Sequence, residues 1–490
     1  MNAMNTRGVV TIASTMLLVA TVMAQVPFAL DTTFRTEIES QYMNSILVRP
    51  DNMVIVSGQI KFPGDLSFRS GALLNIDGTR NINFANVAHM SGKLTPWMDR
   101  IYSGNGQIVR RQYLNGDLDP SFIQMNSGPY FSSLQGGDYH VYPDGRVLMS
   151  GAHSLSDTER GFVGLYNLIW FTNTGYLDTT RVHRKGNGVV SFFNELVDRG
   201  FICSSTCTQF DGEVVDWIFR VDSDGVPDTT FRTRVNWGYA TTFLPLADGR
   251  VYAGGRFRRA PMPNDTLRLV RFRTDGSLDP GFTPPHFGLG TLPNNGLFGP
   301  SVLKVQAWPS GQLLVTGHFQ YVNGEPRRGL CVVDSTGALT PLFDDCGAGP
   351  FTYQGLTNAS LSGLVADADS THYYIWGTYT SYSDAVTNDP LQRFVTRLHA
   401  GDITTGQAQA QGQEAGLHLY PNPSSGIVAL ALERVPKNAV LVVRDAFGRE
   451  VQRHRITDHY TTLSLAESGV YLVEVWDATG RVAVERLLVE

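Results

Sequence analysis

Short runs of apolar residues, punctuated by turn residues, fill most of the chain. Leu269-Val270-Arg271-Phe272 alternates apolar and polar side chains, and Val251-Tyr252-Ala253 is an apolar run that closes on two glycines. Alternation with a period of two indicates a strand with one buried face, whereas a helix needs apolar residues three and four positions apart. The sequence shows no convincing helical period, so the pattern predicts an all-β protein built from many short strands.

One motif recurs along the chain and defines its repeat. The segment Leu30-Asp31-Thr32-Thr33-Phe34 returns in variant forms ending at residues 84, 122, 181, 231, 282 and 343, so successive ends lie 50, 38, 59, 50, 51 and 61 residues apart. The motif positions expected to have a structural role are Asp31, Phe34, Asp119, Phe122, Asp178, Asp228, Phe231, Asp279 and Phe282. Because the motif keeps its place in every unit, we expect the Asp to cap its own turn and the Phe to pack between units. Calcium or glycan binding is the alternative role.

Each unit also carries turn signals between its strands. Examples are Pro143-Asp144-Gly145-Arg146 and Ala247-Asp248-Gly249-Arg250, in which Asp bonds the backbone ahead of it and Gly takes the left-handed conformation. Units of about 50 residues with several strands are typical of a β-propeller blade. Counting from Phe34 to about residue 403 predicts seven blades; the short 38-residue unit keeps six or eight as alternatives.

The turn, the Gly-Gly-x-Phe strand end and the segment Asp-Gly-Ser-Leu-Asp-Pro-Gly-Phe at residues 275–282 together resemble the delta-60 repeat, found in secreted bacterial proteins. The resemblance covers roughly residues 30–400 and is cleanest over 217–282. It implies a β-propeller-like fold. Arg181 replaces the closing Phe and Thr340 replaces the Asp, and these departures bear on the number of blades.

The last part of the chain reads as a separate domain. Residues 404–416 hold no large apolar side chain, which is the composition of a flexible linker. Beyond it, residues 417–490 carry strand-like runs separated by turns, which predicts a small β-sandwich. The runs cover residues 427–432, 439–443, 461–465, 470–476 and 482–489.

Several motifs in this tail resemble the type A C-terminal sorting domain of the type IX secretion system. The residues that carry the resemblance are Tyr420, Pro421, Asn422, Pro423, Gly426, Gly448, Gly469 and Tyr471. It implies transport across the outer membrane of a Bacteroidetes-type bacterium, with the type IX translocon and its sortase as partners. The protein would then lie outside the cell or on the outer-membrane surface, reached through the periplasm. The alternative is an ordinary carbohydrate-binding or adhesive β-sandwich, which the missing aromatic platform disfavours.

The N-terminus has the pattern of a secretory signal peptide. Arg7 precedes an apolar run from Val9 to Ala24, and we expect cleavage near Gln25. The run of 16 residues, interrupted by Thr and Ser, is short for a membrane span of about 20 residues. The expected division is therefore a signal peptide (1–24), a propeller (25–403), a linker (404–416) and a sorting domain (417–490), with no membrane span.

Composition and cysteines narrow the class further. Of 490 residues, 42% are hydrophobic and 17% charged, which excludes a disordered tail, a collagen and a coiled coil. A net charge of -6 leaves no broad positive field for nucleic acid.

In an exported chain the four cysteines can form disulfides. Of the three possible connectivities, closeness in sequence favours Cys203 with Cys207 and Cys331 with Cys346. Buried free thiols are the alternative.

The sequence shows no nucleophile, metal or phosphate-binding motif. There is no GxSxG, HExxH, Walker or GxGxxG pattern, and Asp367 with Asp369 fits a turn better than a calcium loop. We therefore expect no catalytic, cofactor-binding or metal-binding residue. The leading hypothesis is a non-catalytic recognition or adhesion module for an extracellular glycan or protein. The alternatives are a propeller-type hydrolase or lyase, which needs ionisable side chains converging at the channel mouth, and a structural envelope component.

Overall fold

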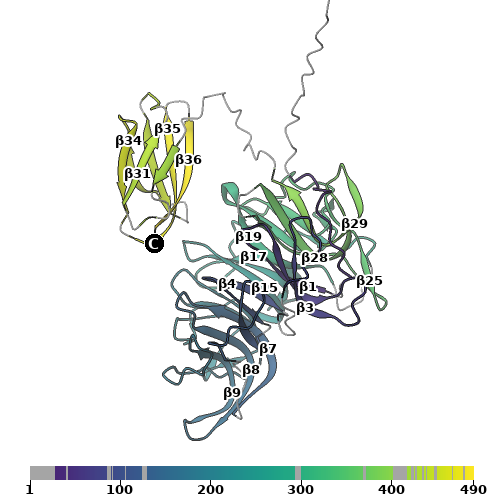
Figure 1. Cartoon of the computed structure of the whole chain (residues 1–490). Coiled ribbons are helices and arrows are strands. Elements are labelled where there is room, and N and C mark those ends of the chain that lie inside the picture. The colour runs from purple at the N-terminus through teal and green to yellow at the C-terminus, as the bar shows by residue number, and fades with distance from the viewer. Residues whose placement is uncertain are drawn as a thin grey trace, which may run out of the picture. The chain divides into compact units, whose positions relative to one another are not determined.

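The computed structural model describes residues 28–39, 42–84, 90, 92–104, 106–123, 130–292, 299–367, 371–400, 417–420, 424, 427–432, 435–437, 439–445, 450–465, 467–477 and 480–489. The predicted signal peptide and linker lie outside these residues. So do five residues of the sorting motifs, Pro421, Asn422, Pro423, Gly426 and Gly448. The chain divides into two compact units, Met1–Asp402 and Ile403–Glu490 (Figure 1).

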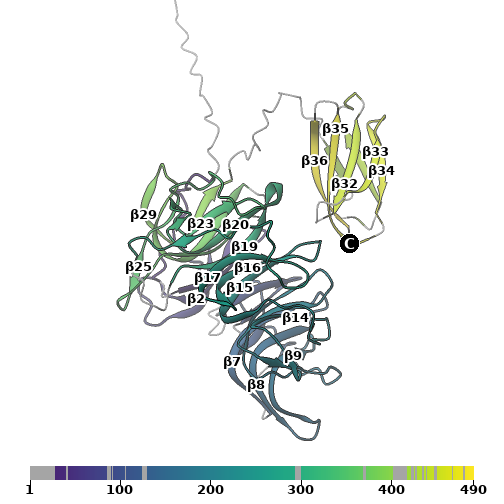
Figure 2. The same ribbon diagram turned by 180° about the vertical axis from the view of Figure 1, so that it is seen from behind.

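The first unit is a β-propeller. Among its described residues the strands pair in seven consecutive antiparallel groups of three, which follow in order the repeats of the sequence (Figures 1 and 2). The groups are β1 (Tyr42–Val48), β2 (Val54–Ile60) and β3 (Arg69–Leu74); β4 (Lys93–Trp97), β5 (Arg100–Gly104) and β6 (Val109–Tyr113); β7 (Phe131–Val141), β8 (Val147–Asp157) and β9 (Phe162–Phe171); β10 (Val190–Glu195), β11 (Phe201–Ser205) and β14 (Ile218–Val221); β15 (Val235–Pro245), β16 (Val251–Arg259) and β17 (Met262–Phe272); β19 (Ser301–Trp308), β20 (Gln312–His318) and β23 (Leu330–Val333); and β27 (Ser360–Ala366), β28 (His372–Ser383) and β29 (Asn388–His399).

Shorter elements lie in the connections between these strands. They are β12 (Gln209–Phe210), β13 (Glu213–Val214), β18 (Phe287–Gly288), β21 (Tyr321–Val322), β22 (Glu325–Pro326), β24 (Gly347–Ala348), β25 (Phe351–Tyr353), β26 (Leu356–Asn358) and one 3-10 turn, η1 (Pro309–Gly311). The turn η1 is the only helical element among the described residues, so the described part of the chain is all-β. None of the described helical structure is long and apolar enough to cross a membrane.

The first strand of each group faces the centre of the ring. The first strands touch in the order β7, β10, β15, β19, β27, β1 and β4. Between β4 and β7, the Lys93 ammonium donates to the Tyr139 carbonyl at 2.8 Å, and the Tyr139 hydroxyl donates to the Lys93 carbonyl at 2.8 Å. The ring of inner strands is therefore continuous.

Glycines on the second strands allow the inner strands to approach closely. A Cβ added at Gly255 would lie 2.3 Å from the Tyr239 carbonyl oxygen, and one at Gly317 would lie 2.2 Å from the Ser301 carbonyl oxygen. Both distances are far below a van der Waals contact, so a side chain at either position would force the first and second strands apart. This explains why the apolar runs of β16 and β20 are followed by glycine; in the fourth group, β11 ends on two serines instead.

The N-terminal segment closes the ring. In most groups the start of the Leu-Asp motif bridges the third strand of its own group, as Leu278 bridges Phe272. The last group has no motif of its own behind β29. There Leu30 bridges Leu398, and the Asp31 amide donates to the Arg397 carbonyl at 3.0 Å. The first motif in the sequence thus serves the last group, and both ends of the propeller meet at one junction.

The hydrophobic core lies between neighbouring groups rather than at one centre. One buried cluster joins Ile202 and Ile218 of the fourth group to Phe243, Phe257 and Phe272 of the fifth. Each group packs one face against the preceding group and the other against the following group. The side chains on both of its faces are therefore shielded from water, as between other packed sheets. Each group is stable only beside the next one, so closure of the ring matters for its terminal groups.

The second unit is a small β-sandwich. One sheet contains β30 (Leu417–Tyr420), β31 (Ile427–Leu432) and β34 (Tyr460–Ser464); the other contains β33 (Glu450–Arg455), β32 (Val440–Asp445), β35 (Gly469–Asp477) and β36 (Gly480–Val489). The two sheets share a core that includes Val428, Leu430, Leu441, Val473 and Leu487. No strand was predicted at β33, because its side chains Glu-Val-Gln-Arg-His-Arg show no buried face and are mostly exposed. The strand β30 was also absent from the prediction.

Candidate functional site at the centre of the propeller

The motif Asp residues form turns with their own neighbours. Asp31 Oδ1 accepts hydrogen bonds from the amide and the hydroxyl of Thr33, at 2.9 and 2.6 Å. The same bonds recur between Asp119 and Ser121, Asp178 and Thr180, and Asp228 and Thr230. In the turn of Asp279 only the bond from the Gly281 amide remains, because glycine has no hydroxyl. This geometry is an Asx turn, which fixes the chain where it leaves each third strand.

In the second and fifth groups an arginine eight residues before the Asp completes the motif, a feature absent from the sequence-based prediction. Arg111 Nε donates to Asp119 Oδ2 at 2.7 Å, and its guanidinium lies 5.0 Å from the ring centre of Phe122. In the fifth group, Arg271 Nε likewise donates to Asp279 Oδ2, at 2.6 Å, and its guanidinium lies 5.5 Å from the ring centre of Phe282. The spacing of eight residues is visible in the sequence, so a search for co-occurring charges would have found it. The buried motif Phe is thus covered by a cation that the motif Asp holds in place.

These contacts favour the ionised carboxylates. Burial opposes ionisation of Asp119, but the hydrogen bonds from Ser121 and Arg111 outweigh it and hold the pKa of Asp119 at about 2, below the ordinary 3.8. Asp279 also has a pKa of about 2, because bonds from Arg250, Gly281 and Arg271 outweigh its burial. A depressed pKa in the folded protein means that ionised Asp stabilises the fold above its unfolded pKa. The contribution disappears as the pH falls toward the folded pKa.

We expect Asp119→Asn to destabilise the propeller at neutral pH and to make little difference near pH 2. Asn keeps the turn but removes the charge that pairs with buried Arg111. The difference in urea midpoint between the native protein and the variant should shrink as pH falls from about 4 to about 2, where Asp119 itself becomes neutral. The matched control is Asp228→Asn, since Asp228 makes the same turn and no ion pair with any described residue. A difference that stays constant with pH would contradict the role of the ion pair.

The four cysteines are present as buried free thiols. Cys203 and Cys207 lie in one hydrophobic cluster, whereas Cys331 and Cys346 lie in two different clusters. Burial raises the pKa of Cys331 and of Cys346 to about 12, so both thiols are poor nucleophiles. The two disulfide pairings stay predictions.

Charged side chains gather where the inner strands meet. The strand pairings place one residue of each first strand at an equivalent position: Ser45, Lys93, Asp138, Phe192, Thr242, Lys304 and Gly363. Three of these carry charge, namely Lys93 on β4, Asp138 on β7 and Lys304 on β19. We call them the central charge cluster. These three residues could not be grouped from the sequence, because equivalence across distant repeats depends on strand register.

Lys93 and Asp138 pair with each other, whereas Lys304 has no partner among the described residues. The ammonium of Lys93 lies 3.2 Å from Asp138 Oδ1. No described residue forms a hydrogen bond or ion pair with the ammonium of Lys304. The surrounding strands displace water from Lys304 and lower its pKa, although its side chain still reaches solvent; Lys93 lowers the pKa further and Asp138 opposes the shift. An unpaired ammonium at this place favours an incoming negative charge.

A histidine and a carboxylate lie beside the central charge cluster. His140, two residues beyond Asp138 on β7, has its Nε2 3.8 Å from Glu195 Oε2. Burial is the main reason that its pKa lies below the ordinary value, while Glu195 opposes the shift; Lys93 and Asp138 also act on it. His140 and Glu195 are therefore two further ionisable groups on the inner strands, near Lys93 and Asp138.

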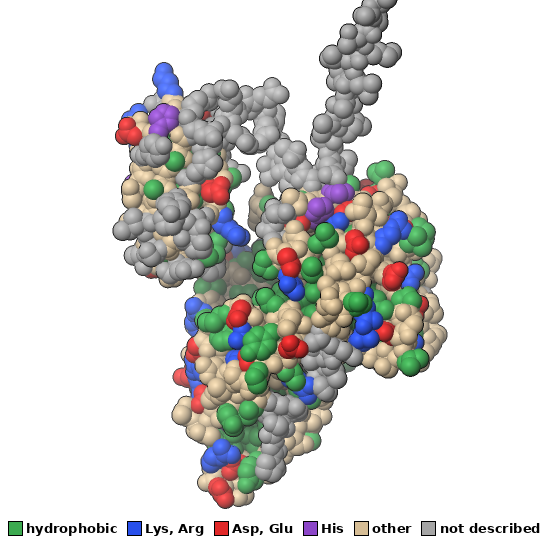
Figure 3. Space-filling model, in the orientation of Figure 1, with side chains coloured by type: hydrophobic (Ala, Val, Ile, Leu, Met, Phe, Trp, Pro, Cys, Tyr) green, Lys and Arg blue, Asp and Glu red, His purple; other side chains and the backbone are tan. Residues whose placement is uncertain are grey.

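A shallow groove lies elsewhere on the propeller, between the third and fourth groups. It encloses about 580 Å³ and is lined by Lys185, Asn187, Gln209 and Asp211, among others. Its polar groups already have partners: the Asn187 side-chain oxygen accepts from the Gln209 amide at 3.0 Å, and Asp211 pairs with Arg184 at 2.8 Å. On the face shown in Figure 3, acidic and basic side chains are interspersed. The central charge cluster is therefore the better candidate for a ligand site.

The described sorting-motif residues lie in the second unit. Tyr420 ends β30 and Gly469 begins β35. Tyr471 is buried, and its hydroxyl donates to the Glu467 carbonyl at 2.8 Å. The role of these residues in sorting stays a prediction.

The fold and the tail define an exported β-propeller protein. Residues 246–282 match the model of a β-propeller domain of unknown function, DUF5122, and residues 418–490 match the secretion system C-terminal sorting domain. The chain is therefore a propeller protein with a type IX sorting domain. It is exported to the cell surface or beyond, and the type IX machinery handles its tail. No curated protein matches the chain.

Solved structures with a similar arrangement are distant in sequence. PorZ, a surface component of the type IX secretion system of Porphyromonas gingivalis, is 14% identical, with a TM-score of 0.36 and coverage of 90% of this chain and 64% of PorZ. The extracellular domain of BT4673 from B. thetaiotaomicron is 9% identical, with a TM-score of 0.36 and coverage of 91% and 56%. A fungal alcohol oxidase of the AA5 family, in complex with copper, is 10% identical, with a TM-score of 0.44 and coverage of 93% and 98%. The chain thus spans less than two thirds of the first two structures.

Proposed function

We propose that the protein is an extracellular recognition module that binds an anionic group of its ligand at the central charge cluster. The observation that carries the proposal is Lys304, an exposed side chain on the inner strand β19 whose ammonium has no partner in the part of the chain that the structure describes. Lys93 adds a second positive charge, and Asp138 neutralises one of the two. The cluster therefore holds a net charge of one positive unit, enough to attract a carboxylate or a sulfate.

The position of the cluster suits recognition. Inner strands from three different groups supply its charges, so the site depends on the rigid closed ring rather than on one loop. A site held by a rigid scaffold spends little free energy on ordering itself when a ligand binds. The mature module would begin near Gln25, and residues 404–416 would be the place where the sorting domain is removed, as exposed linkers are readily cut.

We expect Lys304→Met to weaken binding of an acidic oligosaccharide at least tenfold, because Met keeps the length of the side chain and removes its charge. The probes are an oligogalacturonate and a sulfated oligosaccharide, measured by calorimetry on the purified full chain at low and physiological salt. The matched control is Lys185→Met, which should leave the affinity unchanged. Lys185 is an exposed lysine that lines the shallow groove between the third and fourth groups. Absence of binding to either probe, or equal losses in both variants, would refute the proposed site.

A hydrolase or lyase is the second candidate, and the pair of His140 and Glu195 favours it. A neutral histidine beside a carboxylate is an arrangement that general base catalysis uses. The binding experiment separates the two functions, because an enzyme would shorten the oligosaccharides during the measurement. Intact probes recovered by mass spectrometry would leave recognition as the function.

A further inference from the structure

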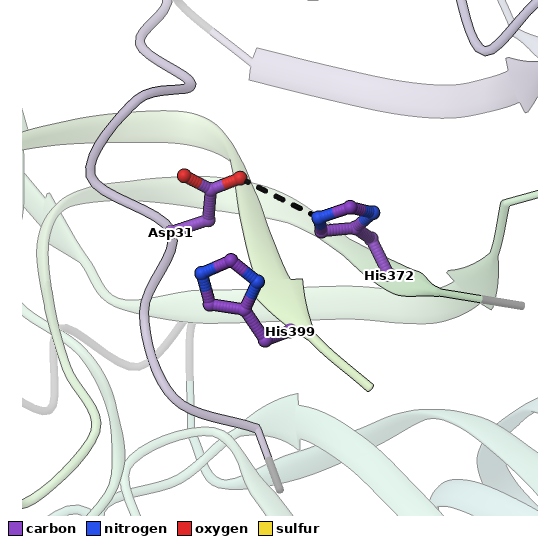
Figure 4. A group of neighbouring side chains, drawn as sticks. All are labelled: Asp31, His372 and His399. Atoms are coloured by element: carbon purple, nitrogen blue, oxygen red, sulfur yellow. Dashed lines mark ion pairs between the residues drawn. The ribbon is translucent and has the colours of Figure 1, made fainter. Parts of the chain in front are cut away.

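Two histidines meet the first motif Asp at the junction that closes the ring (Figure 4). Asp31 belongs to the N-terminal segment, His372 begins β28 and His399 ends β29. Their ligand atoms all lie within 4.8 Å of one another. His372 Nε2 lies 3.7 Å from Asp31 Oδ2, and the two imidazole ring centres are 5.2 Å apart. Residues more than 300 positions apart in the sequence thus converge on one point.

A second carboxylate orients His372. Its Nδ1 lies 3.0 Å from Oδ2 of Asp367, which is buried. The Thr371 hydroxyl donates to the same oxygen at 3.1 Å and helps to hold it. A carboxylate on one ring nitrogen fixes the tautomer and leaves the other nitrogen free to bind a metal, as in carboxylate–histidine–metal sites. The free nitrogen here is Nε2, and it faces Asp31.

The two histidines stand where the fifth group has two arginines. In the fifth group, Arg250 precedes Tyr252 by two residues and Arg273 follows Arg271 by two, and both arginines approach Asp279, at 2.8 and 4.0 Å. At the closing junction, His372 precedes Tyr374 by two residues and His399 follows Arg397 by two, around Asp31. An arginine cannot bind a cation, whereas a neutral histidine can. With histidine in place of arginine at both positions, this junction has side chains that can bind a cation.

We propose that Asp31, His372 and His399 bind a divalent transition metal, with Zn²⁺ as the best-suited ion. Two imidazole nitrogens and one carboxylate oxygen form a ligand set that zinc prefers, with a fourth position left for water. The ligand atoms would have to approach to roughly 3.3 Å of one another around a tetrahedral zinc. The side chain of His372 is 26% exposed and lies near the surface, so a small rotation achieves this.

The charges at the junction are compatible with a cation. Asp31 and Asp367 contribute two negative charges, and Arg397 contributes one positive charge through its bond of 2.7 Å to Asp31 Oδ2. A carboxylate oxygen can accept from an arginine and bind a metal at the same time, because it has two lone pairs. A bound metal would link the N-terminal segment to β28 and β29, and would therefore stabilise the closed ring by an amount that rises with the logarithm of the metal concentration above the Kd.

The test uses the full chain, stripped of metal by a chelator and titrated with Zn²⁺ alone. We expect one strong equivalent in calorimetry, a visible absorption band of tetrahedral type with Co²⁺, and a higher melting temperature with Zn²⁺. His372→Ala and His399→Ala should each weaken the binding at least tenfold. The matched control is the double variant His454→Ala/His459→Ala in the sorting domain, which should bind as the native protein does.

A second variant keeps the test decisive if the alanine variants fail to fold. The double variant His372→Arg/His399→Arg recreates the arrangement around Asp279, so it should fold and melt like the metal-free native protein but show no response to Zn²⁺. If this variant still binds Zn²⁺ at the same strength, or if the native protein binds none, the proposal is overturned. The histidines would then serve only as partners of Asp31 within the ion pair.

Discussion

Deletion of residues 417–490 will trap the protein in the periplasm. The sandwich formed by these residues has a hydrophobic core made entirely of its own side chains, and the propeller closes its ring through residues 28–34 and β29. Loss of the tail therefore removes the sorting signal without removing any strand of the propeller. Fractionation and protease shaving of intact cells should find the native protein outside and the truncated protein inside, in folded form.

A point variant and a transfer experiment separate sorting from folding. Val451→Ser alters an exposed side chain of β33 and should leave export unchanged. Fusion of residues 404–490 to a periplasmic reporter should carry the reporter to the surface. Detection of the truncated protein on the surface in native amounts would show that the tail is not the sorting signal in this chain.

Phe34→Ala will destabilise the propeller by about 3–5 kcal/mol, the usual cost of truncating a buried aromatic side chain. Phe34 is fully buried at the closing junction, where it packs edge-on against Tyr374 at 5.3 Å between ring centres. The guanidinium of Arg397 lies 5.1 Å from the centre of the Phe34 ring. The variant therefore loses contacts to the last group of strands as well as to the first.

The readout is urea unfolding together with hydrogen exchange. Protection should fall in β1–β3 and in β27–β29, which meet at the junction, before it falls in the middle groups. The matched control is Ile82→Ala, in the corresponding motif of the first group, because Ile82 is 82% exposed and its loss should change stability by less than about 0.5 kcal/mol. Equal effects of the two substitutions, or loss of protection only in the middle groups, would contradict the closing role.

The local features of each repeat were predictable because they depend on neighbours in sequence. Asp and Gly turns, strand alternation and the Asx turn at Asp119 involve residues two to four positions apart, so the pattern alone indicates them. The polar strand β33 was not predicted, because its own residues show no apolar face. Its strand partners lie across the sheet, so no local pattern indicates the strand. The spacing of eight residues between Arg111 and Asp119 was readable, but only the pairing of the third strand with the motif explains it.

The sequence by itself determined the all-β class, the repeats of the propeller and the sorting tail, because turn chemistry and side-chain alternation act over short distances. Only the tertiary structure decided which segment closes the ring, and that Lys93, Asp138 and Lys304 share one register on three different groups. It also brought Asp31 to His372 and His399. Such contacts join residues tens to hundreds of positions apart, and their geometry follows from how whole sheets pack around a centre, which no local pattern records.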